Sequence, residues 1–429
     1  MTTTSIIALS VLFLYALVSR RLEHSILTGP LIFTGLGLLM GLGSLFVGQK
    51  EQLQGFLHLL AEITLIFVLF GDASRIHLAS LRKAIELPAR LLLLGMPLAI
   101  FFGAGFALAL FTELSTSEAF LMGALLAPTD AALGQAVVSM EEVPKRIRYA
   151  LNVESGLNDG VALPLILVLI AIGAEDHSLS VAEWANFALF QIVLGPLMGV
   201  LVGGLGAVVL KRQCVAGTVT SPFERLAGFA IAGLCYLVAE AVGGNGFISA
   251  FVGGLAFGNL AGPAVKRVHM FLETEGQLLM LAVFLLFGAL RGPQVLWEAS
   301  LEVWLYALAS LTVIRMLSVY LALRRTRLRF SSELFIGWFG PRGLATILFA
   351  FMILQQKELP HGALVAEVGM ATALLSIVAH GVTAVPLSHA YSRLVAKQPE
   401  KCERELAPSP EPVTRALSRA PTSQQSEAL

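Results

Sequence analysis

Charged residues are scarce in this chain of 429 residues: Asp, Glu, Lys and Arg make up 14% of it, whereas apolar residues make up 56%. In soluble domains about a quarter of the residues are charged, so this composition excludes a disordered chain and argues against an ordinary soluble enzyme. The 29 Lys and Arg balance the 29 Asp and Glu. No basic excess is left for nucleic acid, and we expect no such partner.

Cysteine and histidine are too few and too scattered to build a site. The three cysteines are Cys214, Cys235 and Cys402, and no two of them form a CxxC pair. This spacing argues against both a zinc site and a disulfide framework. The eight histidines do not cluster on the apolar runs, and the pattern HExxH does not occur. We therefore expect no cofactor and no enzymatic activity.

Long apolar runs dominate the chain instead. A spanning helix needs ~20 mostly apolar residues, and these runs are too long for barrel strands. They predict an all-α polytopic membrane protein with about 13 transmembrane helices. The start of the chain lacks basic residues before its apolar run, which indicates a first span rather than a cleaved signal peptide. The predicted spans are 5–18, 26–47, 55–72, 88–112, 117–139, 148–173, 184–210, 222–243, 246–261, 275–291, 298–323, 333–356 and 363–389.

The basic residues predict the orientation of these spans. If the N-terminus lies outside, 24 of the 29 Lys and Arg fall on the inner side and 3 in outer loops, while Arg315 and Arg342 lie within spans. Inner loops carry such an excess, so we predict a multi-pass protein of the cell inner (plasma) membrane with a cytoplasmic C-terminus. Residues 391–429 are rich in Pro, Ser, Gln and charged residues, which predicts a disordered cytoplasmic tail.

Two glycine-rich stretches lie inside the apolar runs, GLGLLMGLG (35–43) and GPLMGVLVGGLG (195–206). Neither has the strand-then-helix context of a dinucleotide fingerprint. We interpret them as surfaces where small residues let helices pack closely.

Eight ionisable residues of the predicted spans are candidates for a position inside the membrane. An ionisable side chain near the bilayer centre costs ~3 kcal/mol on insertion scales, so each is a candidate functional residue. They are Glu62, Asp72, Asp130, Glu154, Asp159, Glu240, Arg315 and Arg342.

The sixth span concentrates polar side chains. At ~100° per residue, four of them fall within an arc of about 140°. They are Glu154, Ser155, Asn158 and Asp159. We interpret this face as a polar stripe that lines a cavity; the alternative is a buried polar cluster that merely locks helices together. Gly156 and Gly160, on the far side, predict a closely packed seam.

Two predicted spans are interrupted. Pro128 removes a backbone donor in the fifth span, and Gly340, Pro341 and Gly343 break the twelfth beside Arg342. Broken spans are tolerated where the backbone lines a cavity or is buried in protein. Because the two spans hold matching positions in inverted halves, they predict a substrate site at the midplane. The alternative is two incidental proline kinks.

Such a site suits a cation and a proton that compete. Hard cations prefer oxygen ligands. Asp159 supplies a charge, Ser155 and Thr129 supply hydroxyls, and the broken spans supply carbonyls. A carboxylate that binds the cation can bind a proton instead, so competition for one site couples the two ions.

Three motifs carry a resemblance to a known family: APTDAAL (127–133), NVESGLNDGVALPL (152–165) and GPRGLAT (340–346). They resemble the motifs of the monovalent cation–proton antiporters of the CPA1 group, the NhaP type, over roughly residues 5–390. The resemblance implies the NhaA/NhaP-like antiporter fold, with inverted repeats and two broken crossing helices. It also implies a homodimer in membrane lipid. The transmembrane domain (1–390) would then consist of a moving core (88–173 and 298–389) and a dimerising part (1–87 and 222–291).

The resemblance also assigns roles at the site. Asp159 would bind either Na⁺ or H⁺, with Thr129 and Ser155 as direct Na⁺ ligands. Asn158 would orient the site, and it stands where electrogenic relatives have a second Asp, which implies electroneutral one-for-one exchange. Asp130 would compensate the dipoles of the half-helices.

Two assignments stay open. Glu154 would pair with an arginine of the late spans, and both Arg342 and Arg315 are available. Relatives carry a carboxylate on the third span near the ion path. Asp72 is the nearest match, but it lies close to the inner end of its span and an interfacial cap is the alternative.

The remaining polar candidates lie away from this motif. Glu62 and Glu240 are expected near the outer surface, in structural roles. His77 and His269 on the inner side are expected to be solvated loop histidines, with pH sensing as the alternative. His380, within the thirteenth span, is expected to form hydrogen bonds in the core.

We predict a Na⁺/H⁺ antiporter that works by alternating access and supports pH homeostasis, with a monovalent cation and a proton as its partners. K⁺ or Li⁺ could replace or join Na⁺, because ligand types do not separate these ions. A membrane-embedded enzyme would need a catalytic pair or a metal cluster, which the sequence does not offer. A cation channel is a weaker alternative, because inverted broken helices around one buried Asp favour a carrier.

Overall fold

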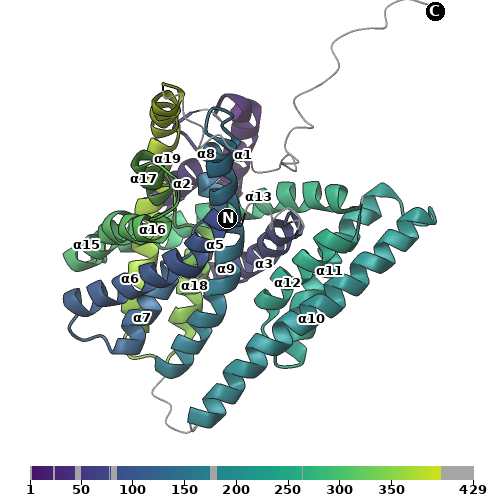
Figure 1. Cartoon of the computed structure of the whole chain (residues 1–429), viewed down its shortest axis with the longest axis horizontal. Coiled ribbons are helices and arrows are strands. Elements are labelled where there is room, and N and C mark those ends of the chain that lie inside the picture. Colours follow the sequence, from purple (N-terminus) through teal and green to yellow (C-terminus); the bar gives the residue numbers. More distant parts are fainter. Residues whose placement is uncertain are drawn as a thin grey trace, which may run out of the picture.

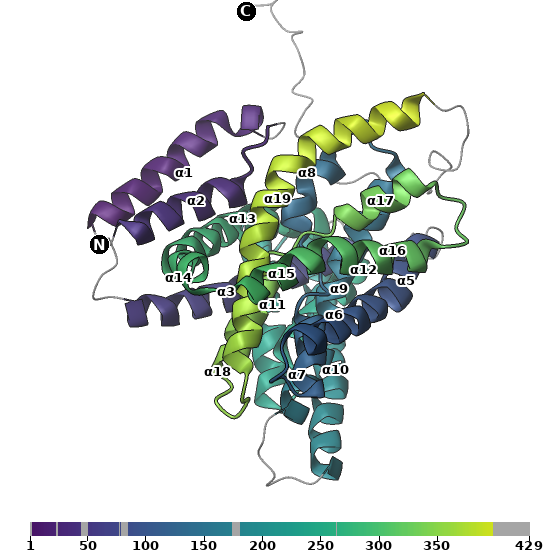
Figure 2. The same ribbon diagram turned by 90° about the vertical axis from the view of Figure 1, so that its left-hand side faces the viewer.

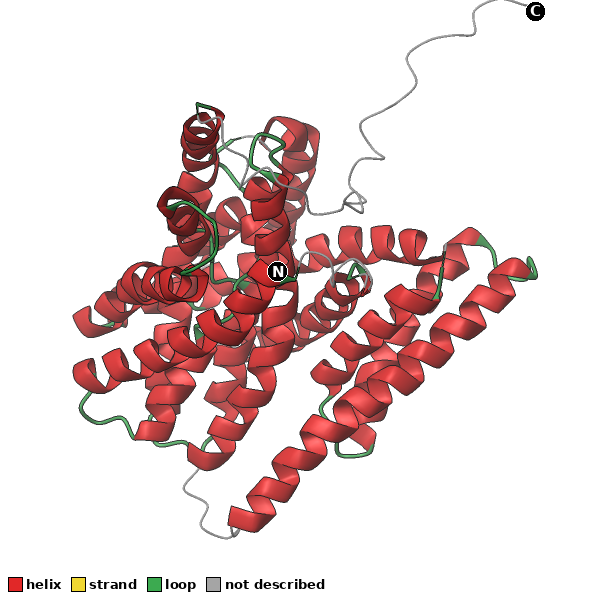
Figure 3. Ribbon diagram, in the orientation of Figure 1, coloured by secondary structure: helices red, strands yellow, loops and turns green. Residues whose placement is uncertain are grey.

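The computed structural model describes residues 2–22, 25–43, 50–76, 78, 85–173, 181–262 and 264–397. Figure 1 shows the arrangement of its helices. Within the described ranges all regular secondary structure is helical, as Figure 3 shows by colour. The helices are α1 (Thr2–Leu22), α2 (Gly29–Leu42), α3 (Lys50–Ser74), α5 (Glu86–Arg90), η1 (Leu91–Gly95), α6 (Met96–Leu110), α7 (Thr116–Leu125), α8 (Ala131–Ser139), α9 (Lys145–Gly173), α10 (Val181–Val215), α11 (Ser221–Ala241), α12 (Gly246–Leu260), α13 (Ala264–Leu290), α14 (Gly292–Glu298), α15 (Leu301–Ala309), η2 (Ser310–Ile314), α16 (Arg315–Leu323), α17 (Phe330–Trp338), α18 (Leu344–Gln355) and α19 (Gly362–Ala396).

The helices are apolar enough for a polytopic membrane protein, as the sequence predicts. Among the described residues, eight helical segments are long and apolar enough to cross a membrane, and four apolar helices are shorter. Each of the thirteen predicted spans overlaps at least one of the observed helical segments. Several of these helices are short or interrupted, so the number of crossings stays a prediction.

The helix ends differ from the predicted spans at both ends of the chain. The first helix, α1, is longer than the predicted span 5–18. The last helix, α19, continues to Ala396, beyond the predicted end of the transmembrane domain at residue 390. The predicted tail therefore begins with helix, and residues 398–429 of it lie outside the described residues.

Both predicted interruptions are confirmed. The helix that begins as α7 stops at Leu125 and resumes as α8 at Ala131, around Pro128. The second stops with α17 at Trp338 and resumes as α18 at Leu344, around Pro341. Proline lacks the N–H that a continuing helix needs, so each break falls where the sequence removes a donor.

A second pair of matched irregularities accompanies these breaks. The fourth predicted span contains one turn of π-helix, η1, and the eleventh contains another, η2. These spans are again seven apart, as expected for two inverted halves. π-turns inside α-helices occur frequently at functional sites. Here η2 ends directly before Arg315, one of the two arginines expected inside the membrane.

The helices form two groups that meet along α3, α9 and α18. One group packs α10 on α11 and α12, α12 on α3, and α2 on α13. The other packs α6 on α7, α7 on α9, and α15 and α18 on α19. Figure 1 shows α10 to α12 on the side opposite α6 and α15, and Figure 2 shows α1 beside α2. The division into a moving and a dimerising part stays a prediction.

Glycines allow the closest contacts in the first group. A Cβ at Gly37 or Gly41 would lie 2.0–2.2 Å from carbonyl oxygens of α13, and a Cβ at Gly199 or Gly203 would lie 2.4–2.5 Å from those of α12. No side chain fits at such distances, so these helix backbones touch directly. The interpretation of both glycine-rich stretches as packing surfaces is confirmed.

Two adjacent glycines of α10 give a matched test of this packing. A Cβ at Gly203 would lie 2.4 Å from the Gly253 carbonyl, whereas a Cβ at Gly204 would make an ordinary 3.6 Å contact with Leu260. We expect Gly203→Ala to destabilise the protein by ~1–3 kcal/mol through overpacking. Gly204→Ala should be neutral or stabilising, by up to ~1 kcal/mol, because alanine favours the helix. Thermal unfolding of the two purified variants in detergent measures this, and equal melting temperatures would contradict it.

Candidate functional site

The two helix breaks cross and bind one another. The backbone N–H of Asp130, in the first break, donates to the carbonyl of Pro341 in the second, over 2.8 Å. This crossing brings together the ends of four half-helices: α7 and α17 end there, and α8 and α18 begin there. Each end leaves backbone groups without a partner inside its own helix.

The carboxylate of Asp130 neutralises the partial positive charge at the N-termini of α8 and α18. Its Oδ1 accepts from the N–H of Leu133 in α8 (3.2 Å), and its Oδ2 accepts from the N–H of Leu344 in α18 (2.6 Å). A carboxylate is the favoured charge at a helix N-terminus, and here one carboxylate serves two. The contact requires glycine at position 343, because a Cβ there would lie 2.0 Å from Asp130 Oδ2.

Arg342 has the opposite role: its guanidinium neutralises the partial negative charge at the C-termini of α7 and α17. Its guanidinium donates to the carbonyls of Leu126, directly after α7, and of Gly340, shortly after α17. Its side chain is 1% exposed. A cation is the favoured charge at a helix C-terminus, so Arg342 and Asp130 neutralise opposite poles of one crossing.

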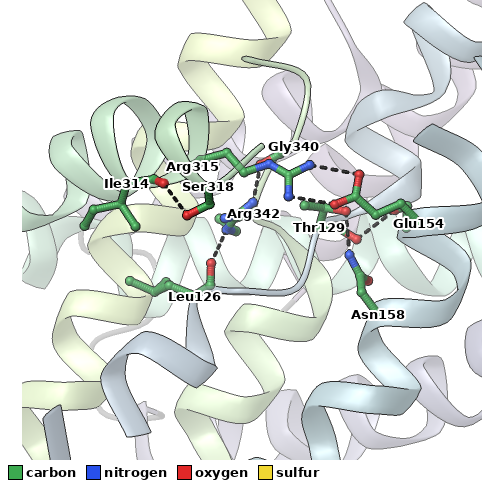
Figure 4. A network of polar contacts seen from close by, with 10 residues as sticks. Leu126, Thr129, Glu154, Asn158, Ile314, Arg315, Ser318, Gly340 and Arg342 are labelled. Carbon is green, nitrogen blue, oxygen red and sulfur yellow. Dashed lines mark hydrogen bonds and ion pairs between the residues drawn. The ribbon is translucent and has the colours of Figure 1, made fainter. Parts of the chain in front are cut away.

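Glu154 of α9 pairs with Arg315 rather than with Arg342. Arg315 Nη1 lies 2.6 Å from Glu154 Oε1, and Nη2 lies 2.9 Å from Oε2. Figure 4 shows the guanidinium of Arg315 and the carboxylate of Glu154 meeting edge to edge, while Arg342 points toward Leu126. Both partners are nearly fully buried. The bidentate geometry decides the alternative that the sequence leaves open.

Thr129 connects the first break to α9. Ser155 Oγ donates to the Thr129 carbonyl, and Asn158 Nδ2 donates to the Thr129 hydroxyl, both over 2.7 Å. All three side chains are buried, as expected for the polar face of the sixth span. After these bonds are made, Asn158 Oδ1 is buried and accepts no hydrogen bond from the described residues.

Asp159 carries the other unsatisfied oxygen. The residue is half-buried, and its Oδ1 is buried without a hydrogen-bond partner in the described part of the chain. It interacts electrostatically with Asp130, Asp72 and Arg342, from three other segments. No direct hydrogen bond joins it to Thr129 or Ser155 among the described contacts, so the predicted three-residue Na⁺ site stays a prediction.

A small, open pocket reaches the crossing from the side where α8 ends and α9 begins. Thr129, Asp130 and Ser155 line its inner wall, together with Asn152, Phe339 and Pro341. Asp159 is not among the residues that line the pocket. Asn152 is exposed and lies within the motif of the sixth span, but its polar side chain alone did not mark it as a lining residue.

The far side of α9 differs from the prediction. A Cβ at Gly160 would press on the Phe251 ring of α12, at 2.9–3.1 Å, as a packed seam requires. A Cβ at Gly156 would meet no atom within 4 Å, so the seam is wrong at that position. The helix wheel gives the direction of a residue but not whether a neighbour lies there.

Asp72 lies in α3, outside the two helix breaks. It interacts electrostatically with Arg75, His269 and Glu273, and also with Asp159. Arg75 Nε donates to His269 Nε2 (2.7 Å) and Arg75 Nη2 lies 3.1 Å from Glu273 Oε1, which joins α3 to α13. His269 is 4% exposed, so its reading as a solvated loop histidine is wrong. His77 lies outside the described residues.

Glu62 and Glu240 make contacts of a structural kind, as predicted. The hydroxyl of Tyr236 donates to Glu62 Oε1, and the N–H of Gly246 donates to Glu240 Oε1 over 2.7 Å. Both contacts fasten neighbouring helices and lie outside the crossing.

The chain is similar to known transport proteins. Residues 7–390 match the family model described as sodium/hydrogen exchanger, transmembrane. A K(+)/H(+) antiporter NhaP of Alkalimonas amylolytica is 28% identical over 90% of this chain and 66% of its own length. A K(+)/H(+) antiporter NhaP2 of Shewanella sp. (strain ANA-3) is also 28% identical, over 93% of this chain and 66% of its own. The Na(+)/H(+) antiporter ApNhaP of Aphanothece halophytica is 27% identical, over 75% and 62%.

These alignments cover only part of the relatives: the chain spans about two thirds of the length of the curated relatives it matches. Among solved structures, the sodium proton antiporter MjNhaP1 of Methanocaldococcus jannaschii superposes with a TM-score of 0.76 at 20% identity. That match covers 92% of this chain and 100% of the other. The predicted antiporter fold is confirmed.

The pairing of Glu154 with Arg315 predicts a specific pattern of coupling. Breaking a buried ion pair leaves an uncompensated charge, so Glu154→Gln and Arg315→Gln should each destabilise the protein by ~3–5 kcal/mol. The double variant should lose much less than the sum of the two. Arg342→Gln is the control: it removes donors from Leu126 and Gly340, and combined with Glu154→Gln it should be closer to additive. Thermal unfolding in detergent measures all five variants, and equal coupling in the two pairs would contradict the assignment.

Proposed function

The chain belongs to the sodium/hydrogen exchanger family, and we propose that it exchanges a monovalent cation for a proton across the membrane at Asp159. One observation carries this proposal. Among the carboxylates around the crossing, Asp130 and Glu154 are engaged by backbone donors and by Arg315, whereas Asp159 keeps a buried oxygen without a partner in the described part of the chain. That oxygen is available to a cation or to a proton, but not to both.

The oxygens near Asp159 supply the other ligands of the proposed site. The carbonyl oxygen of Asn158 is free, and the Thr129 hydroxyl, which accepts from Asn158, keeps its own hydrogen and a lone pair. Ser155 contributes a second hydroxyl oxygen and lines the pocket. Neutral oxygens around one carboxylate suit a monovalent hard cation, because they complete its coordination without adding charge.

Asn158 supports electroneutral exchange. Its side chain cannot titrate, and it is fixed to Thr129 by a 2.7 Å hydrogen bond. Asp159 is then the one carboxylate of the site that changes its charge when a cation replaces a proton. One cation for one proton moves no net charge.

Two cations are candidates. The sequence resemblance favours Na⁺, and ApNhaP is named a Na(+)/H(+) antiporter. K⁺ is the second candidate, because the two relatives with 28% identity are both named K(+)/H(+) antiporters. The donor set is the same for both ions, so the choice between them rests on transport measurements.

The proposed orientation places the pocket on the cytoplasmic side. The basic residues Lys145, Arg146 and Arg148 begin α9 at that end, which supports an inner location. The protein would lie in the plasma membrane with its N-terminus outside, as a homodimer. In alternating access, the two crossing helix breaks and the bound ion would move relative to α3. Asp72 of α3 would attract cations to the cytoplasmic entry of the site.

Asp159→Asn should abolish exchange and leave folding and membrane insertion intact. The amide keeps the shape of the side chain and removes both its charge and its titration. The measurement is pH-gradient-driven flux in proteoliposomes with Na⁺, K⁺ and Li⁺ in turn, alongside wild type. Wild-type flux should not respond to an imposed membrane potential. Transport by the variant at the wild-type rate would refute the proposed role of Asp159, and a voltage response would refute one-for-one exchange.

Competition at one carboxylate also predicts the pH dependence. Acidification should raise the apparent KM for the cation by at most about tenfold per pH unit, because one proton competes with one ion. The maximal rate should stay constant as pH falls, until protonation of the site on the opposite side of the membrane limits turnover. Exchange is measured over three pH units, equal on both sides of the membrane. A steeper dependence, or a fall in maximal rate at constant KM, would indicate a separate titrating group.

A further inference from the structure

Three polar residues of α19 face the second helix break and have no part in the proposed ion chemistry. Ser376, His380 and Thr383 are spaced by four and three residues, so they share one face of the helix. Ser376 and His380 are fully buried, with at most 1% exposure. We call these three residues the α19 stripe.

The stripe fastens the end of α17. His380 Nε2 lies 2.9 Å from the Trp338 carbonyl, within hydrogen-bond distance. The indole Nε1 of the same tryptophan donates to Thr383 Oγ1 (3.0 Å), and the Trp338 and His380 rings lie 5.2 Å apart. The last residue of α17 is therefore fixed at its backbone and at its side chain.

The stripe also fastens the break itself. The backbone N–H of Arg342 donates to Ser376 Oγ over 2.7 Å. His380 Nδ1 lies 3.0 Å from that same oxygen. Nδ1 also lies 3.0 Å from the backbone carbonyl of Ser376. The Ser376 hydroxyl binds Nδ1 in either tautomer, as donor to an unprotonated Nδ1 or as acceptor from a protonated one, and in both cases it keeps a lone pair for the Arg342 N–H. One imidazole thus connects the carbonyl before the break to the N–H within it.

From Arg342 the contacts continue to the ion site in two steps. Pro341, directly before Arg342, accepts from the N–H of Asp130 through its carbonyl. Leu344, two residues after Arg342, donates its N–H to the Asp130 carboxylate. Asp130 directly follows Thr129, whose hydroxyl and carbonyl bind α9. A shift of the Arg342 backbone therefore displaces both bonds of Asp130 and, through it, Thr129.

We propose that His380 is a positioning residue of the cation site: acting through Ser376, it holds the second break in register with Asp130 and so keeps Thr129 in place beside Asp159. This inference rests on the proposed function for the identity of the ligand. It requires that loss of the imidazole weakens cation binding at a site that the imidazole does not touch.

The test compares variants of purified full-length protein. His380→Ala removes both contacts, Ser376→Ala removes the second, and His380→Gln keeps a side-chain N–H for the Trp338 carbonyl. Thr372→Val is the matched control, because Thr372 is buried in α19 and donates within its own helix, to the Val368 carbonyl. Two quantities are measured: apparent KM and maximal rate in proteoliposomes, and the shift in melting temperature that Na⁺, K⁺ or Li⁺ produces in detergent.

His380→Ala and Ser376→Ala should each raise the apparent KM about tenfold, the effect of one buried hydrogen bond, with a maximal rate within about twofold of wild type. The double variant should be no worse than either single variant, because both act on one contact chain. His380→Gln should recover part of the affinity, and Thr372→Val should match wild type. The cation-dependent melting shift should fall in parallel with the rise in KM.

A wild-type KM in both alanine variants would overturn the proposal. So would a double variant whose loss of cation affinity equals the sum of the losses in the two single variants. If His380→Ala does not fold, Ser376→Ala and His380→Gln decide the outcome by the same two measurements. If wild type itself transports none of the three cations, the proposed function fails. The melting shift still tests His380 in that case: equal shifts in wild type and variants, or no shift in any of them, would overturn its role.

Discussion

Backbone groups at a helix break inside a membrane have to be satisfied by the protein, because lipid offers no hydrogen bonds. The structure meets this constraint with two charges of opposite sign. Asp130 binds the N–H groups that begin α8 and α18, and Arg342 binds the carbonyls that follow α7 and α17. The neighbouring residues follow from this arrangement: Gly343 leaves room for the carboxylate of Asp130, and Gly340 leaves room for Arg315.

The same arrangement isolates the chemistry at Asp159. Once Asp130 and Arg342 are committed to the backbone and Glu154 to Arg315, those charges are fixed in pairs and contribute little net charge to the site. Asp159 keeps a buried oxygen with no partner in the described residues, and the neutral oxygens of Asn158, Thr129 and Ser155 are the other ligands that we propose. A scaffold of satisfied charges around one unsatisfied carboxylate is what competition between a cation and a proton requires.

The helices and the two helix breaks were predictable from local sequence. Apolar runs predict the helices, and Pro128 and Pro341 predict the breaks, because each signal lies within one segment. The partner of Glu154 was not predictable, because it depends on how α9 and α16 are rotated toward each other, to which the π-turn before Arg315 contributes. The seam at Gly156 was wrong for the same reason. His380 forms hydrogen bonds in the core, as expected, but its partner Trp338 comes from a distant segment and was not predictable.

The central claim is that one carboxylate binds either ion, and the most direct test counts protons released when the cation binds. Calorimetric titration of the purified protein with its transported cation, repeated in buffers of different ionisation enthalpy, gives this number without any transport step. The account predicts that release rises toward one proton per bound cation as pH falls, and that Asp159→Asn releases none. Cation binding without proton release at any pH, or release that survives in Asp159→Asn, would contradict it.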